Sequence, residues 1–337
     1  MDRRTFVLGA AGALLATSQI AQLQASENSG EIVVGILGNE GPSSPGPGAM
    51  AFGVATSNAL VSEIEAVTKA AYASRVRCVN VGGTDVESLS VQAPRLLGQK
   101  TAVIVAVGTR SAIAAARATK GLPIVMVGVA DPVALGLVRS LARPDGDITG
   151  VSLLGPEILE KSLDFLREAA PSIKRAAVLW NPSNPGAALS VRHMQLAATA
   201  KGLNFVSVPV EQAAQLDEAL TDLMQLQHDA LVLIDDPVFL ARGERILTYC
   251  SERRLPTMFS TAGWVTRGGL MSYEPQAAHM YRRAAAYVAR ILGGAKPRDL
   301  PVEQPTLFSF VLNMKAANAL GLTIPPSLLL RADQVIE

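Results

Sequence analysis

The chain has 337 residues, of which 49% are hydrophobic, and its 30 Lys and Arg nearly balance its 29 Asp and Glu. This length predicts two domains, and the hydrophobic content is sufficient for two cores. The near-neutral charge argues against a nucleic-acid-binding protein, which needs clustered Lys and Arg, and against a basic patch for a membrane surface.

The first residues have the pattern of an export signal. Arg3 and Arg4 precede an apolar stretch that ends at Ala16 and is too short to span a bilayer. The segment 3–7 also resembles a twin-arginine signal, although a general export signal remains open. Cleavage near Ala25 would remove residues 1–25 and leave a mature protein in the periplasm.

Short apolar runs alternate with helix-period segments along the rest of the chain. Strands are expected at 31–37, 75–81, 102–107, 123–129, 175–180, 204–210, 230–234, 256–259, 269–273 and 307–312. Helices are expected at 53–73, 110–119, 156–170, 187–201, 212–227, 238–254, 276–292 and 314–320. Continuous β-branched runs indicate strands that are buried on both faces of a parallel sheet. The fold class is therefore α/β, with two doubly wound lobes built from βαβ units.

One segment interrupts this alternation. Residues 38–48 read G-N-E-G-P-S-S-P-G-P-G, a density of glycine and proline that predicts an irregular loop. It is either a lid over a site or a surface insertion. The prolines also argue against a phosphate-binding loop, which needs a helix to begin at once.

No motif for catalysis, metal binding or a cofactor is present. The chain lacks a Gly-x-Ser-x-Gly elbow, and its three histidines have no ligand spacing with one another or with cysteine. Cys78 and Cys250 lie in distant runs, so two buried free thiols are favoured over a disulfide. We therefore expect no cofactor, no metal and no enzymatic activity.

Polar residues follow the carboxyl ends of several strands, where open parallel sheets bind their ligands. Most of these residues can also cap a helix, so each has a purely structural alternative. Helix N-termini at this edge would suit an anionic group, and Asp131 or Asp236 could hold an ammonium group. The candidate ligand-binding residues are Thr109, Ser111, Asp131, Ser152, Asn181, Ser183, Asn184, Asp236, Ser260 and Tyr273.

Eight stretches resemble a known family. They are residues 129–138, 141–144, 149–152, 178–185, 268–273, 291–297, 300–306 and 319–328, the last reading A-L-G-L-T-I-P-P-S-L. The chain is similar to ABC-transporter substrate-binding proteins of the tryptophan/tyrosine-binding type, which have the type I periplasmic-binding-protein fold. The similarity covers about residues 101–337. The first lobe departs from the family pattern, because the Gly/Pro segment follows the first strand.

The resemblance implies a monomeric solute-binding subunit that closes on its ligand by hinge motion and delivers it to an ABC permease in the inner membrane. The ligand would be an amino acid, and the resemblance alone extends this to an aromatic one. Three chain crossings are expected near 148–152, 258–261 and 305–308. They would give one lobe of residues 30–150 plus 262–305 and a second of residues 151–258 plus 308–337.

Two other classes of protein remain open. The first is a periplasmic sensor that passes its signal to a receptor, which neighbouring permease and ATPase genes would argue against. The second is an exported α/β enzyme, which would need a nucleophile or a cofactor loop.

Overall fold

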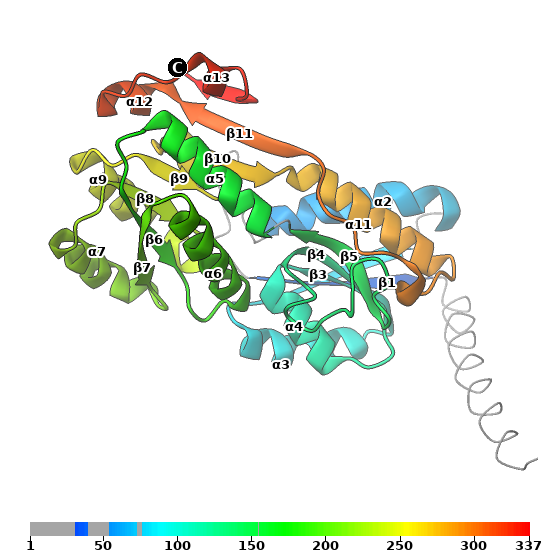
Figure 1. Cartoon of the computed structure of the whole chain (residues 1–337). Helices are drawn as coiled ribbons and strands as arrows, with labels where there is room; N and C mark the ends of the chain where they lie inside the picture. Colours follow the sequence, from blue (N-terminus) through cyan, green and yellow to red (C-terminus); the bar gives the residue numbers. More distant parts are fainter. Residues whose placement is uncertain (1–30, 40–53, 73–75, 154) are drawn as a thin grey trace, which may run out of the picture.

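The computed structural model describes residues 31–39, 54–72, 76–153 and 155–337, which form two α/β lobes on separate sheets (Figure 1). The expected signal peptide and all but the first two residues of the Gly/Pro segment 38–48 lie outside the described residues. Within the described ranges, no helix is both long and apolar enough to cross a membrane.

The first lobe is built on a five-stranded parallel sheet in the order β2-β1-β3-β4-β5. Its β3 and β4 are almost entirely buried, as expected for strands covered on both faces. Helices α2 and α11 cover one face, and α3 and α4 cover the other. The elements are β1 (Ile32–Asn39), α2 (Val54–Tyr72), β2 (Val76–Gly83), α3 (Val86–Leu97), β3 (Thr101–Val107), α4 (Thr109–Ala118), β4 (Ile124–Ala130), β5 (Ile148–Leu153), α11 (Ala277–Leu292) and the short η2 (Pro297–Asp299).

The second lobe has a seven-stranded sheet in the order β12-β11-β10-β9-β8-β6-β7. Alternate residues of β6 face opposite cores, one formed with α5, α6, α12 and α13 and the other with α7, α8, α9 and α10. The elements are α5 (Gly155–Ala169), β6 (Arg175–Trp180), α6 (Pro185–Ala200), β7 (Asn204–Pro209), η1 (Ala213–Gln215), α7 (Leu216–Gln225), β8 (Ala230–Leu233), α8 (Pro237–Leu240), α9 (Gly243–Glu252), β9 (Thr257–Phe259), α10 (Ala262–Thr266), β10 (Met271–Pro275), β11 (Phe308–Asn313), α12 (Met314–Leu320), α13 (Pro326–Leu329) and β12 (Gln334–Ile336).

One strand pair of the second sheet is antiparallel, which the parallel expectation missed. The chain leaves the end of β10 that faces the first lobe and forms α11, which packs on that lobe. It then returns past Glu303 and enters β11 from the same end of the sheet (Figure 1). On the way back, Glu303 forms a bridge with Val151 of β5. Because the connection leaves the sheet for the other lobe, the rule that crossovers join parallel strands does not apply to it.

The lobe boundaries differ from the expected ones in two places. Strand β5 lies in the first sheet through Leu153, so the first crossing follows it and does not lie at 148–152. Helix α10 packs on β9, β10 and β11 of the second sheet, so the second crossing lies near Gln276 and not at 258–261. The segment 262–275 therefore belongs to the second lobe. Strands β11 and β12 both belong to the second sheet.

Both cysteines are free thiols, as expected. Cys250 is buried, and burial raises its pKa to about 12. Cys78 is only half-buried, because it lies in β2 at the edge of the first sheet.

Close packing of β4 on β5 requires glycine at position 150, and this requirement can be tested. The Gly150 φ of 135° favours glycine, and an added Cβ would overlap the Met126 backbone of the neighbouring strand. Gly268 has a similar φ of 117°, but its Cβ would meet nothing within 4 Å. We expect Gly268→Ala to cost about 1–3 kcal/mol of unfolding free energy from backbone strain alone. Gly150→Ala should cost clearly more, as measured by denaturant unfolding; equal losses would contradict the packing of β4 on β5.

Candidate ligand-binding cleft

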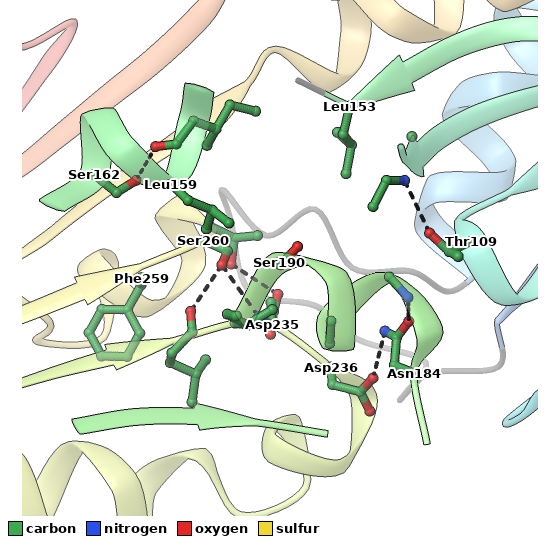
Figure 2. A pocket seen from close by; sticks show the side chains of 18 of the residues that line it. Thr109, Leu153, Leu159, Ser162, Asn184, Ser190, Asp235, Asp236, Phe259 and Ser260 are labelled. Atoms are coloured by element: carbon green, nitrogen blue, oxygen red, sulfur yellow. Dashed lines mark hydrogen bonds between the residues drawn. The ribbon is translucent and has the colours of Figure 1, made fainter. Parts of the chain in front are cut away.

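A cavity of about 140 Å³ lies between the two lobes (Figure 2). Its size is comparable to a roughly 150 Å³ protein cavity that holds benzene. Figure 2 shows Thr109 and Leu153 of the first lobe on one side of it, with Leu159, Ser190 and Asp235 of the second lobe opposite. The cavity lies at the carboxyl ends of the parallel strands of both sheets, the position where such sheets bind ligands.

The first lobe contributes the N-terminus of α4. Gly108 ends the turn after β3 with a φ of 85° and precedes the helix, and no side chain caps this end. Gly108, Thr109 and Arg110 all line the cavity. The free amides of a first helical turn, together with the helix dipole, favour an anionic group.

Arg110 crosses the cleft and pairs with Asp236 of the second lobe. Its guanidinium lies 3.0 Å from Asp236 Oδ2, and the two side chains are 2% and 0% exposed. It also donates a 3.3 Å hydrogen bond to Ser183 Oγ, whereas its Nε has no partner. The ion pair therefore ties the two lobes together and leaves one buried donor free beside the cavity.

Asp236 is held from its own lobe as well. Asn181 Nδ2 donates to one carboxylate oxygen at 2.9 Å, and Asn184 Nδ2 donates to the other at 3.1 Å. The backbone amide of Val238 donates at 3.3 Å, so Asp236 is also the N-cap of α8. With a cation and three neutral donors, this buried carboxylate is well compensated.

Asp235 points the opposite way from its neighbour, as expected for adjacent residues of an extended chain. It lines the cavity and accepts hydrogen bonds from Trp264 Nε1 and Thr261 Oγ1, both at 3.2 Å. Removal from water raises the pKa of Asp235 to about 6, and the charge of Asp236 adds to the shift. No salt bridge to Asp235 occurs among the described residues.

Glu274, on β10, lies beyond Asp235 and is 6% exposed. One of its carboxylate oxygens accepts a 2.7 Å hydrogen bond from the backbone amide of Ala262, and the other has no partner. Burial raises the pKa of Glu274 to about 8, with a further contribution from the negative charge of Asp235.

The wall of the cavity on the second lobe is largely apolar. The residues that form it come from α5, α6, β9 and β10, among them Leu159, Met194, Met258 and Tyr273. Tyr273 is fixed by an edge contact with the ring of Phe165, with centroids 5.2 Å apart. An apolar body with a few placed polar groups is the usual make-up of a small-molecule site.

The structure brings part of the expected residue set to this cavity. Five of the ten line it: Thr109, Asn184, Asp236, Ser260 and Tyr273. Asn181 and Ser183 do not line it but support the Arg110–Asp236 pair. Ser111 is buried on α4, with a hydroxyl that has no partner. Ser152 contacts the Glu303 carbonyl, where the chain crosses between lobes.

Asp131 has the structural role that the sequence left open as its alternative. Its Oδ1 accepts a 3.0 Å hydrogen bond from the backbone amide of Ala134, and Asp131 does not line the cavity. Its φ of 29° lies in the left-handed region, which Asp tolerates better than most residues. The acids that line the cavity are Asp235 and Asp236.

The expected set lacks most of the residues that line the cavity, among them Arg110, Asp235 and Gly186. Arg110 lies in the first turn of α4, three residues after β3 ends at Val107, so its position near a strand end was available as a signal. A Cβ on Gly186 would lie 2.6 Å from Thr109 Oγ1, which is a contact between lobes that no sequence pattern marks.

Comparison with known proteins shows which family the chain belongs to. A model of the family described as ABC transporter substrate binding protein matches residues 78–336. The chain belongs to this family. It is 26% identical over 230 residues to a tyrosine-binding protein of Clostridioides difficile (strain R20291). That match covers 68% of this chain and 66% of the relative, slightly under two thirds.

Solved structures show the same fold. An ABC domain in complex with L-Trp from Streptococcus pneumonia superposes with a TM-score of 0.79 at 23% identity, covering 91% of this chain and 100% of that one. A conserved domain protein from Vibrio cholerae gives 0.78 at 24% identity, covering 90% and 99%. A periplasmic binding protein/LacI regulator from Alkaliphilus metalliredigens gives 0.54 at 13%, covering 82% and 96%. The type I periplasmic-binding-protein fold expected from the sequence is confirmed.

The cross-lobe ion pair predicts a response to mutation. Arg110→Met keeps the side-chain length but leaves Asp236 without its cation, and opening of the lobes would let water solvate that carboxylate. We expect a larger radius of gyration by solution X-ray scattering. Arg139→Met is the control, because it breaks an exposed pair with Asp145 and should change nothing. An unchanged scattering curve for Arg110→Met would contradict a closing role for the pair.

Asp131 provides a second test of the cleft. Asp131→Ala removes an acceptor and should lower the unfolding free energy by about 1 kcal/mol. Asp131→Asn retains the acceptor and the tolerance of a positive φ, so it should be nearly neutral in a denaturant melt. Neither variant should change ligand affinity. A tenfold loss of affinity in Asp131→Asn with unchanged stability would assign Asp131 to the ligand instead.

Proposed function

We propose that the mature protein is the periplasmic solute-binding subunit of an ABC importer. In this function it captures a small molecule between its lobes and delivers it to an inner-membrane permease. Family membership supports a substrate-binding role rather than catalysis. The observation that carries the proposal is a cavity lined by both lobes and closed by a buried cross-lobe ion pair. Export would depend on the Arg3–Arg4 signal, and the protein would act as a monomer.

The cavity also supports a ligand class. A ligand carboxylate would accept hydrogen bonds from the first amides of α4, since this helix end lines the cavity and no side chain caps it. An apolar or aromatic body would pack against Leu159, Met258 and Tyr273. Two relatives support an aromatic amino acid, because one is named a tyrosine-binding protein and another was solved with L-Trp.

A sensor that passes its signal to a receptor would use the same cleft and the same closure. It remains the second candidate, and neighbouring permease and ATPase genes would favour the importer. An enzyme is a weaker candidate, because the polar groups that line the cavity are a paired Arg110–Asp236 couple, one further acid and several hydroxyl and amide groups.

The direct test is a thermal-shift screen of amino acids and small organic acids, including L-tyrosine and L-tryptophan. A ligand at about 100 times its dissociation constant should add roughly 2.7 kcal/mol of stability, which is an easily measured shift. Stabilisation by an aromatic amino acid supports the proposal. If no compound shifts the melt, the proposed ligand class is wrong.

Gly186→Ala separates cleft binding from binding elsewhere. The added Cβ would contact Thr109 and Ala130 of the opposite lobe, so it should hinder closure. We expect affinity for the best ligand of the screen to fall at least tenfold by calorimetric titration, with the melting temperature of the free protein nearly unchanged. Gly98→Ala, on the surface of the first lobe, is the matched control. Full affinity in Gly186→Ala would place the ligand outside the closed cleft.

A further inference from the structure

Asp235 and Asp236 are adjacent acids with opposite environments. Asp236 is fully buried and has Arg110 as its cation. Asp235 is only partly covered and lines the cavity, and both of its hydrogen-bond donors, Trp264 and Thr261, are neutral. A carboxylate in such surroundings without a counterion is costly, because neutral donors replace only part of its hydration.

The surrounding cations are already committed to other acids. Arg110, from α4, pairs with Asp236. Arg267, at the end of α10, lies over the Trp264 ring and pairs with Glu244 of α9. From β10, the group that faces Asp235 is the further acid Glu274. Within the described residues, Asp235 and Asp236 are the acids that line the cavity, Glu274 lies close to Asp235, and Asp235 has no salt bridge.

Glu274 determines which of the two uncompensated acids carries the charge. It is the more deeply buried, and its second oxygen has no partner. Its pKa of about 8 lies above the pKa of about 6 for Asp235. At neutral pH Glu274 therefore retains its proton, and Asp235 presents the negative charge to the cavity.

We propose that Asp235 is the anionic anchor for a protonated amine of the ligand. The amine would supply the counterion that the protein lacks, so the cleft selects solutes with a cationic nitrogen over organic acids and neutral molecules of the same shape. Glu274 acts as a positioning residue, which stays neutral and leaves the charge on Asp235. The inference rests on the proposed function, because it assumes that the cleft binds a solute.

The anchor has a pH dependence of definite sign. A proton and an amine compete for Asp235, so affinity for an amine-bearing ligand should fall as the pH is lowered through about 6. The free protein should respond in the opposite direction. Since the folded-state pKa of Asp235 lies above its ordinary value of 3.8, stability is present at low pH and is lost as the pH rises from about 4 to about 6.

A matched set of probes tests the ligand class. L-tryptophan carries both charged groups, tryptamine carries only the amine, and indole-3-propionate carries only the carboxylate. We expect tryptophan and tryptamine to bind at least tenfold more tightly than indole-3-propionate by calorimetric titration. Asp235→Asn should weaken binding of the two amines at least tenfold and leave indole-3-propionate unchanged. Tight binding of indole-3-propionate, or full affinity of the amines for Asp235→Asn, overturns the proposal.

A second measurement needs no ligand. Asp235→Asn removes an uncompensated charge, so it should raise the melting temperature of the free protein at pH 7. Asp236→Asn, the matched substitution at the next residue, should lower it, because it weakens the pair with Arg110. A fall in melting temperature for Asp235→Asn would make the acid structural and overturn the proposal. If Asp235→Asn is stabilising but no indole probe binds, the aromatic ligand class fails and the anchor stands.

Discussion

The closed cleft depends on one buried ion pair whose members lie on different lobes. Arg110 lies on α4 of the first lobe and pairs with Asp236 of the second lobe, and both side chains are almost completely buried. Breaking such a pair inside a rigid core costs about 3–5 kcal/mol, because one charge stays buried alone. Here the chain has another option, since opening the lobes returns both charges to water. The pair therefore couples solvation of two side chains to the hinge.

The same constraint explains why two adjacent acids differ so much. Backbone alternation sends Asp236 toward Arg110, Asn181 and Asn184, and it sends Asp235 toward Trp264 and Thr261. The first acid is compensated within the protein, and the second is held in place without compensation. The free helix N-terminus at Gly108–Arg110 favours an anionic ligand group, whereas the Asp235 carboxylate, which has no counterion, favours a cationic one. An apolar wall completes a site suited to a small zwitterion.

The sequence predicted the elements better than the site. Buried strands such as β3 and β4 follow from continuous β-branched runs, and β6 and α12 begin and end where expected. The expected helix at 238–254 is two helices, because α8 ends at Leu240 and α9 begins at Gly243. Short elements such as α10 and β12 were missed, since three to five residues carry too little periodicity to be recognised. The longer α3 and β5 were also not expected.

The sequence predicted only part of the site, and the reason is physical. Residues such as Thr109 and Asp236 are placed by the strand ends they follow, and sequence order alone locates them. The partnership of Arg110 with Asp236, the clearance at Gly186 and the lack of a cation near Asp235 depend on how one lobe meets the other. Residues 110 and 236 are far apart in the chain, so no local pattern could pair them. The antiparallel β11 has the same origin, because its direction depends on the path through the first lobe.

The most direct measurement of the central claim is a crystal structure with the amine-bearing compound that stabilises the protein most. We predict that the cationic nitrogen of this compound lies within hydrogen-bond distance of the Asp235 carboxylate, with the lobes closed over it and the Arg110–Asp236 pair intact. A carboxylate, if present, should lie at the N-terminus of α4. A bound compound whose nitrogen points away from Asp235, or one that lies outside the cleft, would contradict the account.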